Sequence, residues 1–323
     1  ASSGLGIVYV SSNTAVATVT PTGTVSIVGV GSTNITASQA GDGNWNAAPD
    51  QMQSLTVNNL LTQTITFNAL SNVTYGSADF NLTAAGGGSG NALTYTSSNT
   101  AVATVSGSRV TIVGAGTTNI TASQAGNSTY NPASDVIQSL TVDKANLTAT
   151  ADNKSKAFGE VNPTLTISYT GFATGDNVSA ITAPTIATTA ITTSDAGSYG
   201  ISLTGGSGGA NYNLTIVDGA LTINKATQTI TFTTISNQTL QNSPITLQAN
   251  ATSGLSVVFT LLEGDGVISG NELTFNGAGT FKVNAAQSGN TNYLAANTLE
   301  QTFVVTSPTK QDQTITFEAI PAK

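Results

Sequence analysis

The sequence of 323 residues contains no cysteine and no histidine, and it carries few charges. Its 8 Lys or Arg and 16 Asp or Glu make up 7% of the chain, whereas an ordinary soluble domain has about 25% charged residues. Without imidazole or thiolate groups, a Ser-His-Asp triad, a cysteine nucleophile and a zinc site of the usual ligand types are excluded. Only carboxylate, lysine, tyrosine and other oxygen-ligand chemistry is left to the chain.

The balance of charge excludes a further class of partner. The formal net charge is -8, and binding to a phosphate backbone depends on clustered Lys and Arg. We therefore expect no nucleic-acid partner. No apolar run approaches the roughly 18 residues needed to cross a bilayer, so we expect no membrane span in this segment. The 39% of hydrophobic residues predicts a chain that folds.

What the sequence does contain is an internal repeat. Three motifs return after 85 or 86 residues: SSNTAVATV (Ser11 and Ser97), TNITASQAG (Thr33 and Thr118) and QSLTV (Gln53 and Gln138). A fourth motif, QTITF, starts at Gln63, Gln228 and Gln313. The chain opens partway through one repeat and closes at the start of another, so we expect it to be a window of a longer protein.

A diverged copy of the repeat predicts the type of secondary structure. Ser269–Tyr293 aligns without gaps on Ser106–Tyr130, and apolar residues alternate with polar ones in both. This period of two is typical of strands with one buried face. We predict an antiparallel β-sandwich for each repeat. Four glycines are predicted to form the hairpin turns in this alignment, where positive φ is needed: Gly114 and Gly116 in one copy, Gly277 and Gly279 in the other.

Between these copies lies a module of a second type. It holds four of the seven lysines, which marks a change in composition. Its predicted strands are 145–151, 164–169, 199–203 and 214–223, with a glycine-rich turn at 205–209.

The repeats and this change of composition predict five parts. They are a partial first repeat (1–58), a second repeat (59–142), a central module (143–226), a third repeat (227–306) and a C-terminal segment (307–323) that starts a further module. Short extended junctions join them, and such junctions restrict bending more than Gly/Ser linkers do. We therefore predict an all-β tandem array that forms an extended rod.

The motifs resemble two known families. SSNTAVATV, the following VGAGTTNITA and the AGNxxY motif resemble bacterial Ig-like (Big) domains. The sequence from Lys144 to Asp176 closely resembles the opening of the MBG domain. This resemblance implies an adhesin on the outer surface of a bacterium, such as the giant SprB-type adhesins of gliding bacteria. It also implies partners in a type IX secretion or motility machinery, and contact with an extracellular surface or polysaccharide through distal parts of the chain.

Three aromatic residues occupy one position of the repeat and are the candidate ligand contacts. Trp45, Tyr130 and Tyr293 each follow the QAG or QSG motif in a loop. Aromatic rings on loops can stack on sugar rings. The alternative interpretation is that each ring closes the end of its own sandwich, and recurrence in every repeat fits that interpretation equally well.

No cofactor is expected, and calcium is the one metal to consider. Asp42, Asp176 and Asp265 lie beside glycine in turns and offer oxygen ligands, as do Asp143 and Asp312 near junctions. A calcium site needs several converging oxygens, and no EF-hand spacing is present. Asp that caps its own turn is the commoner role.

No catalytic residues are predicted. Glu263, Asp265 and Glu272 are the densest carboxylates, but the other repeats have no equivalent acids. Lys154 and Lys156 remain candidates for an isopeptide crosslink, which requires a buried lysine beside a carboxylic acid.

The predicted function is a non-catalytic stalk segment of a secreted surface adhesin or filament. Two alternatives stay open: glycan binding by the aromatic loops, and an accessory role in a secreted polysaccharide-degrading enzyme.

Overall fold

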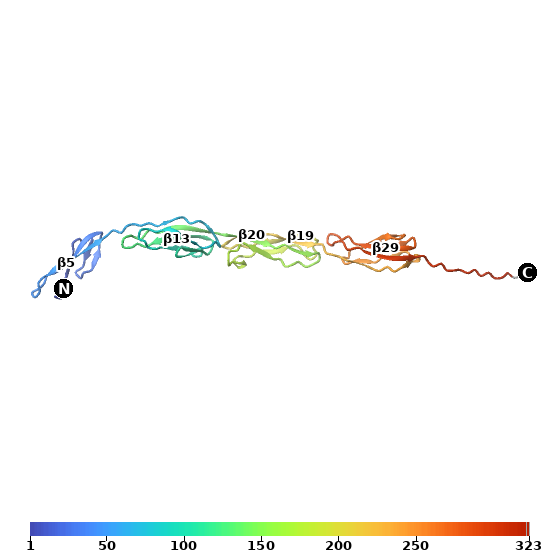
Figure 1. Cartoon of the computed structure of the whole chain (residues 1–323), viewed down its shortest axis with the longest axis horizontal. Coiled ribbons are helices and arrows are strands. Elements are labelled where there is room, and N and C mark those ends of the chain that lie inside the picture. Colours follow the sequence, from blue (N-terminus) through green and yellow to red (C-terminus); the bar gives the residue numbers. More distant parts are fainter. Residues whose placement is uncertain (321, 323) are drawn as a thin grey trace. The chain divides into compact units, whose positions relative to one another are not determined.

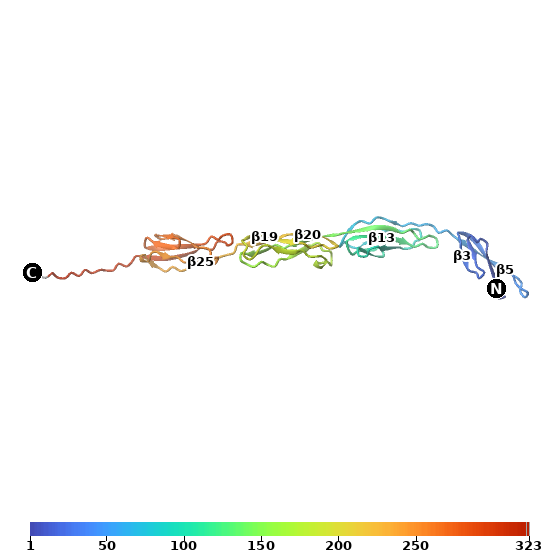
Figure 2. The ribbon, with the colours of Figure 1, turned by 180° about the vertical axis from the view of Figure 1, so that it is seen from behind.

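The computed structural model describes residues 1–320 and 322, and within them β-strands are joined by loops and two 3-10 helices. None of the helices in this part of the chain is long and apolar enough to cross a membrane. By contacts the chain divides into two compact units: Ala1–Ala145 with Ala210–Tyr212, and Asn146–Gly209 with Asn213–Lys323. Figure 1 and, from behind, Figure 2 show that the second repeat, the central module and the third repeat each gather their own strands.

The first repeat has five strands in two sheets. The larger sheet has the order β1-β4-β5, and β2 pairs with β3. The bounds are β1 Val8–Ser11, β2 Ala17–Val19, β3 Val25–Ile27, β4 Gly31–Gln39 and β5 Ala48–Val57.

The second repeat is a complete sandwich. One sheet has the order β10-β13-β14-β7 and the other β11-β12-β8, with a short pair β6-β9 beside them. The core between the sheets includes Ile65, Phe67, Val110, Ile120 and Leu140. The bounds are β6 Thr66–Phe67, β7 Val73–Thr74, β8 Phe80–Asn81, β9 Ala84–Ala85, β10 Leu93–Ser97, β11 Ala103–Ser106, β12 Arg109–Ile112, β13 Gly116–Gln124 and β14 Val136–Asp143.

The central module also has two sheets, of order β17-β15-β20 and β16-β21-β19-β18. Its core includes Ala149, Ile201 and Leu221. The bounds are β15 Ala145–Ala151, β16 Lys154–Ala157, β17 Ile167–Thr170, the 3-10 helix η1 Val178–Ala180, β18 Thr185–Thr188, β19 Gly197–Thr204, β20 Tyr212–Val217 and β21 Gly219–Asn224.

The third repeat has the arrangement of the second. Its sheets have the orders β23-β30-β29-β26 and β24-β28-β27, with the pair β22-β25. Phe281, Phe303 and Phe275 lie together in its core. The bounds are β22 Ile230–Phe232, β23 Gln238–Thr239, η2 Leu240–Asn242, β24 Ile245–Thr246, β25 Ala249–Ala251, β26 Val258–Glu263, β27 Gly266–Ser269, β28 Glu272–Phe275, β29 Gly279–Ala286 and β30 Leu299–Thr306.

The alternation read from the aligned repeats is confirmed in the long strands. In β13 the side chains of Thr118, Ile120 and Ala122 are buried, and the polar residues between them face outward. In β29, Phe281 and Val283 are fully buried at the equivalent positions. Most strand pairs are antiparallel, as predicted, but parallel pairs also occur in the second repeat, the central module and the third repeat: β7 with β14, β16 with β21, and β23 with β30.

The predicted hairpin at Gly114 and Gly116 is wrong. The segment carries the chain from β12 in one sheet to β13 in the other, so the flanking strands do not pair. A side chain at Gly114 would bring its Cβ to 2.7 Å from the carbonyl oxygen of Ala101. Of Gly114 and Gly116, the second alone has a positive φ, of 142°. Gly277 and Gly279 connect β28 to β29 in the same way. At these positions glycine therefore lets the chain pass close to neighbouring atoms as it crosses from one sheet to the other.

The predicted strand 214–223 is also two strands. It breaks at Asp218, whose carboxylate accepts a hydrogen bond from the backbone N–H of Leu203. The chain then passes from the sheet of β15 to the sheet of β19. The Cβ of a side chain at Gly219 would lie 2.3 Å from the carbonyl oxygen of Ala151, which explains the glycine at the crossover. The predicted strand 145–151 coincides with β15.

Candidate functional site

The three aromatic residues end loops of one geometry. In each loop, the side-chain oxygen of an Asp or Asn accepts hydrogen bonds from the N–H groups two and three residues later. These oxygens belong to Asp42, Asn127 and Asn290, and the second donor in each case is Trp45, Tyr130 or Tyr293. This is an Asx turn. It fixes the backbone of the aromatic residue and explains the role of Asp42, a calcium candidate, without a metal.

A glycine precedes each loop because the aromatic residue's carbonyl lies against it. The Cβ of a side chain at Gly126 would be 2.3 Å from the carbonyl oxygen of Tyr130. The same distance separates Gly289 from the carbonyl oxygen of Tyr293. The QAG and QSG motifs are therefore part of the loop's packing.

The surroundings of the three rings differ. The Tyr130 ring lies over Gly88, where a Cβ would be 2.4 Å from Cζ. The Tyr293 ring packs edge-on against Phe158, with centroids 5.5 Å apart. Both tyrosines are half-buried, whereas Trp45 is 54% exposed. Each ring lies in the loop of its own repeat, and two of the three already have a packing partner.

Each tyrosine loop binds the linker that leads into its own module. The N–H of Leu61 donates to the carbonyl of Thr129, and the N–H of Asn131 donates to the carbonyl of Leu61. In unit 2 the N–H of Ala226 donates to the carbonyl of Asn292 in the same manner. Leu61 therefore forms an isolated parallel β-bridge with Tyr130, and Ala226 forms one with Tyr293.

The glutamine of QTITF, which lies two residues after the bonded linker residue, is also held against the loop by hydrogen bonds of its side chain. Gln63 is buried and donates to the carbonyls of Ala125 and Asn131, while its side-chain oxygen accepts from the N–H of Ser89. Its counterpart Gln228 donates to the carbonyl of Leu294. These hydrogen bonds matter because a buried side-chain amide without partners lowers the stability of the fold.

Asn292 extends these contacts to a second loop of unit 2. Its side-chain oxygen accepts from the N–H of Ala196 at 2.8 Å, and its amide donates to Asp195 at 2.8 Å. Asn292 therefore holds the linker with its backbone and the 195–196 loop with its side chain, next to the Tyr293–Phe158 ring contact. We call this set of contacts the asparagine clamp.

Unit 1 contains a second asparagine clamp. The carbonyl of Asn211 accepts from the N–H of Ala145, and its side-chain oxygen accepts from the N–H of Ala115 at 2.9 Å. The next residue, Tyr212, packs edge-on against Tyr75 at 5.5 Å. These clamps were not predicted from the sequence. A usable signal was present, because both linkers read Lys-Ala (144–145 and 225–226) and both loops read Asn-Tyr (211–212 and 292–293).

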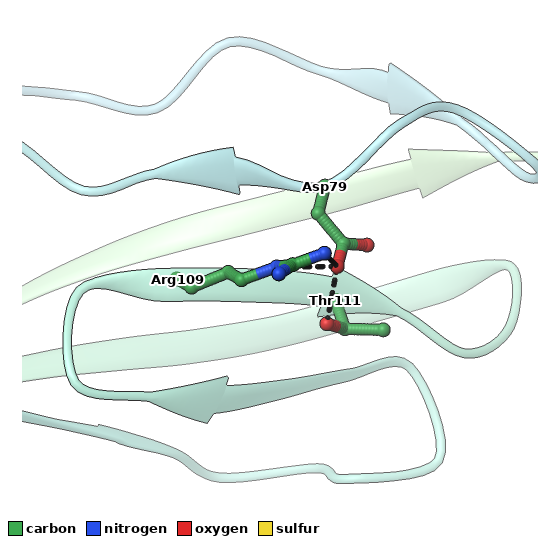
Figure 3. Close-up of polar contacts among 3 residues, drawn as sticks. All are labelled: Asp79, Arg109 and Thr111. Atoms are coloured by element: carbon green, nitrogen blue, oxygen red, sulfur yellow. Dashed lines mark hydrogen bonds and ion pairs between the residues drawn. The ribbon is translucent and has the colours of Figure 1, made fainter.

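Two aspartate side chains, those of Asp79 and Asp152, accept hydrogen bonds from nearby side chains of their own modules. The Asp79 carboxylate accepts hydrogen bonds from Thr111 at 2.8 Å and from Nε of Arg109 at 2.7 Å (Figure 3). The Thr111 hydrogen bond is the main cause that lowers the pKa of Asp79; partial burial opposes it, and Arg109 adds to the lowering. Hydrogen bonds from Ser168 and then Thr166 lower the pKa of Asp152 likewise.

The other candidates do not converge into a site. Among residues 1–320 and 322, no group of three or more Asp and Glu side chains could hold a metal ion. Lys156 is buried, but its Nζ donates to the backbone carbonyls of Glu160 and Ile191 instead of a carboxylate. Lys154 is half-buried on the same strand.

The comparisons agree with the two kinds of module. Residues 147–222 match the family model described as MBG domain (YGX type). Residues 75–126 match the model described as intimin, immunoglobulin-like domain. No curated protein matches the sequence significantly.

Solved structures similar to the chain are multi-domain proteins. The Drosophila N-cadherin EC1-4 structure is 11% identical, with 94% of this chain and 92% of that chain covered and a TM-score of 0.25. The human desmocollin-1 ectodomain is 8% identical, with 95% and 75% covered and a TM-score of 0.29. Domains 4–9 of the surface layer protein SbsC are 15% identical, with 94% and 58% covered and a TM-score of 0.23. The chain is a tandem array of Ig-like β-sandwich modules.

Proposed function

We propose that this chain is a non-catalytic stalk segment of a surface protein, in which the five parts given above act as successive spacers. The observation that carries the proposal is the bonding of each linker. Leu61 and Ala226 are each held on both sides by the loop that follows the QAG or QSG motif. Linkers bonded in this way resist bending more than free Gly/Ser segments do.

The family matches support the location of the stalk. MBG and intimin-type Ig-like modules match 147–222 and 75–126, and such modules are chiefly structural repeats of bacterial surface proteins. We propose an extracellular position on the outer surface of a bacterium, in an adhesin that contacts its target through other parts of the chain. A role in gliding motility with type IX secretion is the more specific form of this proposal.

The test is the length of the segment. Deletion of the whole central module (143–226) is expected to shorten the particle seen by electron microscopy by about one module, roughly 30–40 Å for strands of eight to ten residues at about 3.3 Å each. A control that replaces the central module by the second repeat should keep the length. An unchanged length after the deletion would contradict the spacer role.

A second candidate function is glycan binding at the aromatic loop, favoured by the 54% exposure of Trp45. A glycan array distinguishes the two. Binding that is lost in Trp45→Ala, but retained in Tyr130→Ala, would support a sugar site on the first repeat. If no glycan binds, the sugar site is contradicted and the spacer role is the one proposal left.

A further inference from the structure

The third repeat carries a polar groove along the segment that leads from β24 to β25, the strand labelled in Figure 2. Two neighbouring hollows form the groove, with volumes of about 340 and 270 Å³, and both are lined by Gln248. The lining residues of both hollows are all uncharged. Together the hollows reach the size of ligand sites in proteins, which is about 300–1,000 Å³.

The backbone beside the groove is already hydrogen-bonded. The N–H of Leu247 donates to the carbonyl of Asn271, and the carbonyl of Gln248 accepts from the N–H of Thr233. Leu247 is 2% exposed and anchors the segment in the core. Because alternate residues of an extended segment face opposite sides, Gln248 and Asn250 are exposed. A ligand in the groove therefore meets side chains at this point, and not an open strand edge.

Three side-chain amides line the larger hollow, those of Gln248, Asn250 and Asn271. Other amides of the repeat are bonded to the protein, as those of Gln228 and Gln301 are. Within residues 1–320 and 322, by contrast, no hydrogen bond to the protein engages the three amides of the hollow. A side-chain amide offers an acceptor and two donors at once. These three can therefore bond a ligand whose own groups both donate and accept.

The second repeat has the same backbone here but different side chains. The N–H of Leu82 donates to the carbonyl of Ser108, as that of Leu247 donates to Asn271. The fold of the repeat is thus built without the amides, which are a feature of the third repeat. Gln248, Asn250 and Asn271 take the places of Thr83, Ala85 and Ser108.

The same hollow also offers apolar surface. Val257 and Phe259 line it and are half-buried. The Phe259 ring is held against that of Phe232, with centroids 5.4 Å apart. An aromatic ring fixed beside an aliphatic side chain can pack on the C–H face of a sugar ring, while neighbouring amides bond the hydroxyl groups of the sugar.

We infer that this groove of the third repeat binds a neutral oligosaccharide. Hydroxyl groups donate and accept as the amides do, and the uncharged lining suits a ligand without charge. Two adjoining hollows fit a linear chain of sugar residues, with Gln248 bonding it where they meet. This site goes beyond the spacer role, and it lies in a different repeat from Trp45.

The experiment uses the complete chain of 323 residues. The probes are neutral linear hexasaccharides: cellohexaose, xylohexaose, mannohexaose and maltohexaose. The side-chain amide NMR signals of Gln248, Asn250 and Asn271 report on the site directly. At least one probe is expected to shift these signals in a saturable manner and to leave the signals of the second repeat in place.

The matched variant gives the third repeat the residues of the second: Gln248→Thr with Asn250→Ala and Asn271→Ser. The three positions are exposed, and the second repeat folds with these residues, so the backbone amide spectrum away from the groove should be kept. The affinity for the probe should fall by about tenfold or more, since the sugar hydroxyls lose their partners. The control Trp45→Ala should bind as the parent does.

Four outcomes would overturn the inference. One is the absence of a saturable shift with every probe, and another is equal affinity of the matched variant and the parent. The third is loss of binding in Trp45→Ala, which would move the sugar site to the first repeat. The fourth is the same set of shifts with a neutral Gly-Ser peptide, which would mean that the groove does not select sugars. The spacer role is tested separately, by the length of the particle.

Discussion

The asparagine clamp of unit 2 gives the sharpest test of how a linker is held. In Asn292→Ala the side-chain hydrogen bonds to Ala196 and Asp195 are lost, but the backbone carbonyl still accepts from Ala226. One hydrogen bond of this type contributes about 0.5–1.5 kcal/mol. Because every 1.4 kcal/mol is a factor of ten in an equilibrium, exchange of the Ala196 amide should rise about twofold to tenfold.

Hydrogen exchange measured by NMR reads the two amides separately. The Ala196 amide should exchange faster in Asn292→Ala, with a much smaller change at Ala226. The matched control is Asn211→Ala in unit 1, which should speed exchange of Ala115 and leave Ala196 unchanged. Unchanged exchange at Ala196 in Asn292→Ala would refute the clamp. Equal acceleration throughout the third repeat would show loss of stability instead.

Three further substitutions test the loops, the core and the pH response. Gly126→Ala places a Cβ 2.3 Å from the carbonyl oxygen of Tyr130 and should lower the free energy of unfolding in urea by about 1–3 kcal/mol. Phe281→Ala removes a fully buried ring and should cost about 3–5 kcal/mol in the same measurement. The pKa of Asp79 is lower in the folded chain than its ordinary value, chiefly through Thr111, so its contribution to stability is present above about pH 4. That contribution should disappear as pH falls through the lowered pKa, and Asp79→Asn should flatten this part of the urea midpoint against pH.

Controls for these substitutions come from open positions of the chain. Gly43→Ala meets no atom within 4 Å, and Ile315→Ala alters a side chain that is 88% exposed. Both should leave the unfolding free energy of the chain within about 0.5 kcal/mol of the parent. A Gly126→Ala variant as stable as Gly43→Ala would contradict the close approach. An Asp79→Asn variant with the parent's pH profile would contradict the proposed hydrogen-bonded carboxylate.

The strands were predictable where one face of the sheet meets the core. Burial selects every second residue, and Phe281 and Val283 show it directly. The crossovers at Gly114 and Asp218 could not be predicted in the same way. The alternation of apolar and polar residues continues when the chain passes from one sheet to the other, and it does not indicate which strand the next one pairs with. The parallel pairing of β7 with β14 is a long-range contact that no local pattern contains.

The linker contacts could not be predicted from the sequence for a similar reason. Asn292 and Ala196 are 96 residues apart in the chain, and a single Asn in a polar loop resembles any turn residue. The aromatic positions were found, but their role could not be chosen. Packing against Gly88 and Phe158 favours the structural interpretation for Tyr130 and Tyr293, while contact with a ligand stays a prediction.

The asparagine position also separates the linkers into two kinds. The loop that binds Ala226 has Asn292, which reaches a second loop, whereas the loop that binds Leu61 has Thr129 at the same place. Thr129 offers its backbone carbonyl to the linker, but its side chain has a single hydroxyl and lacks the separate oxygen and NH2 group with which Asn292 bonds Ala196 and Asp195. The linker of Leu61 is also one residue longer, counted from Val57, than that of Ala226 counted from Ile223. Since length and the missing amide both loosen the attachment, bending of a stalk built from these parts should concentrate at residues 58–60.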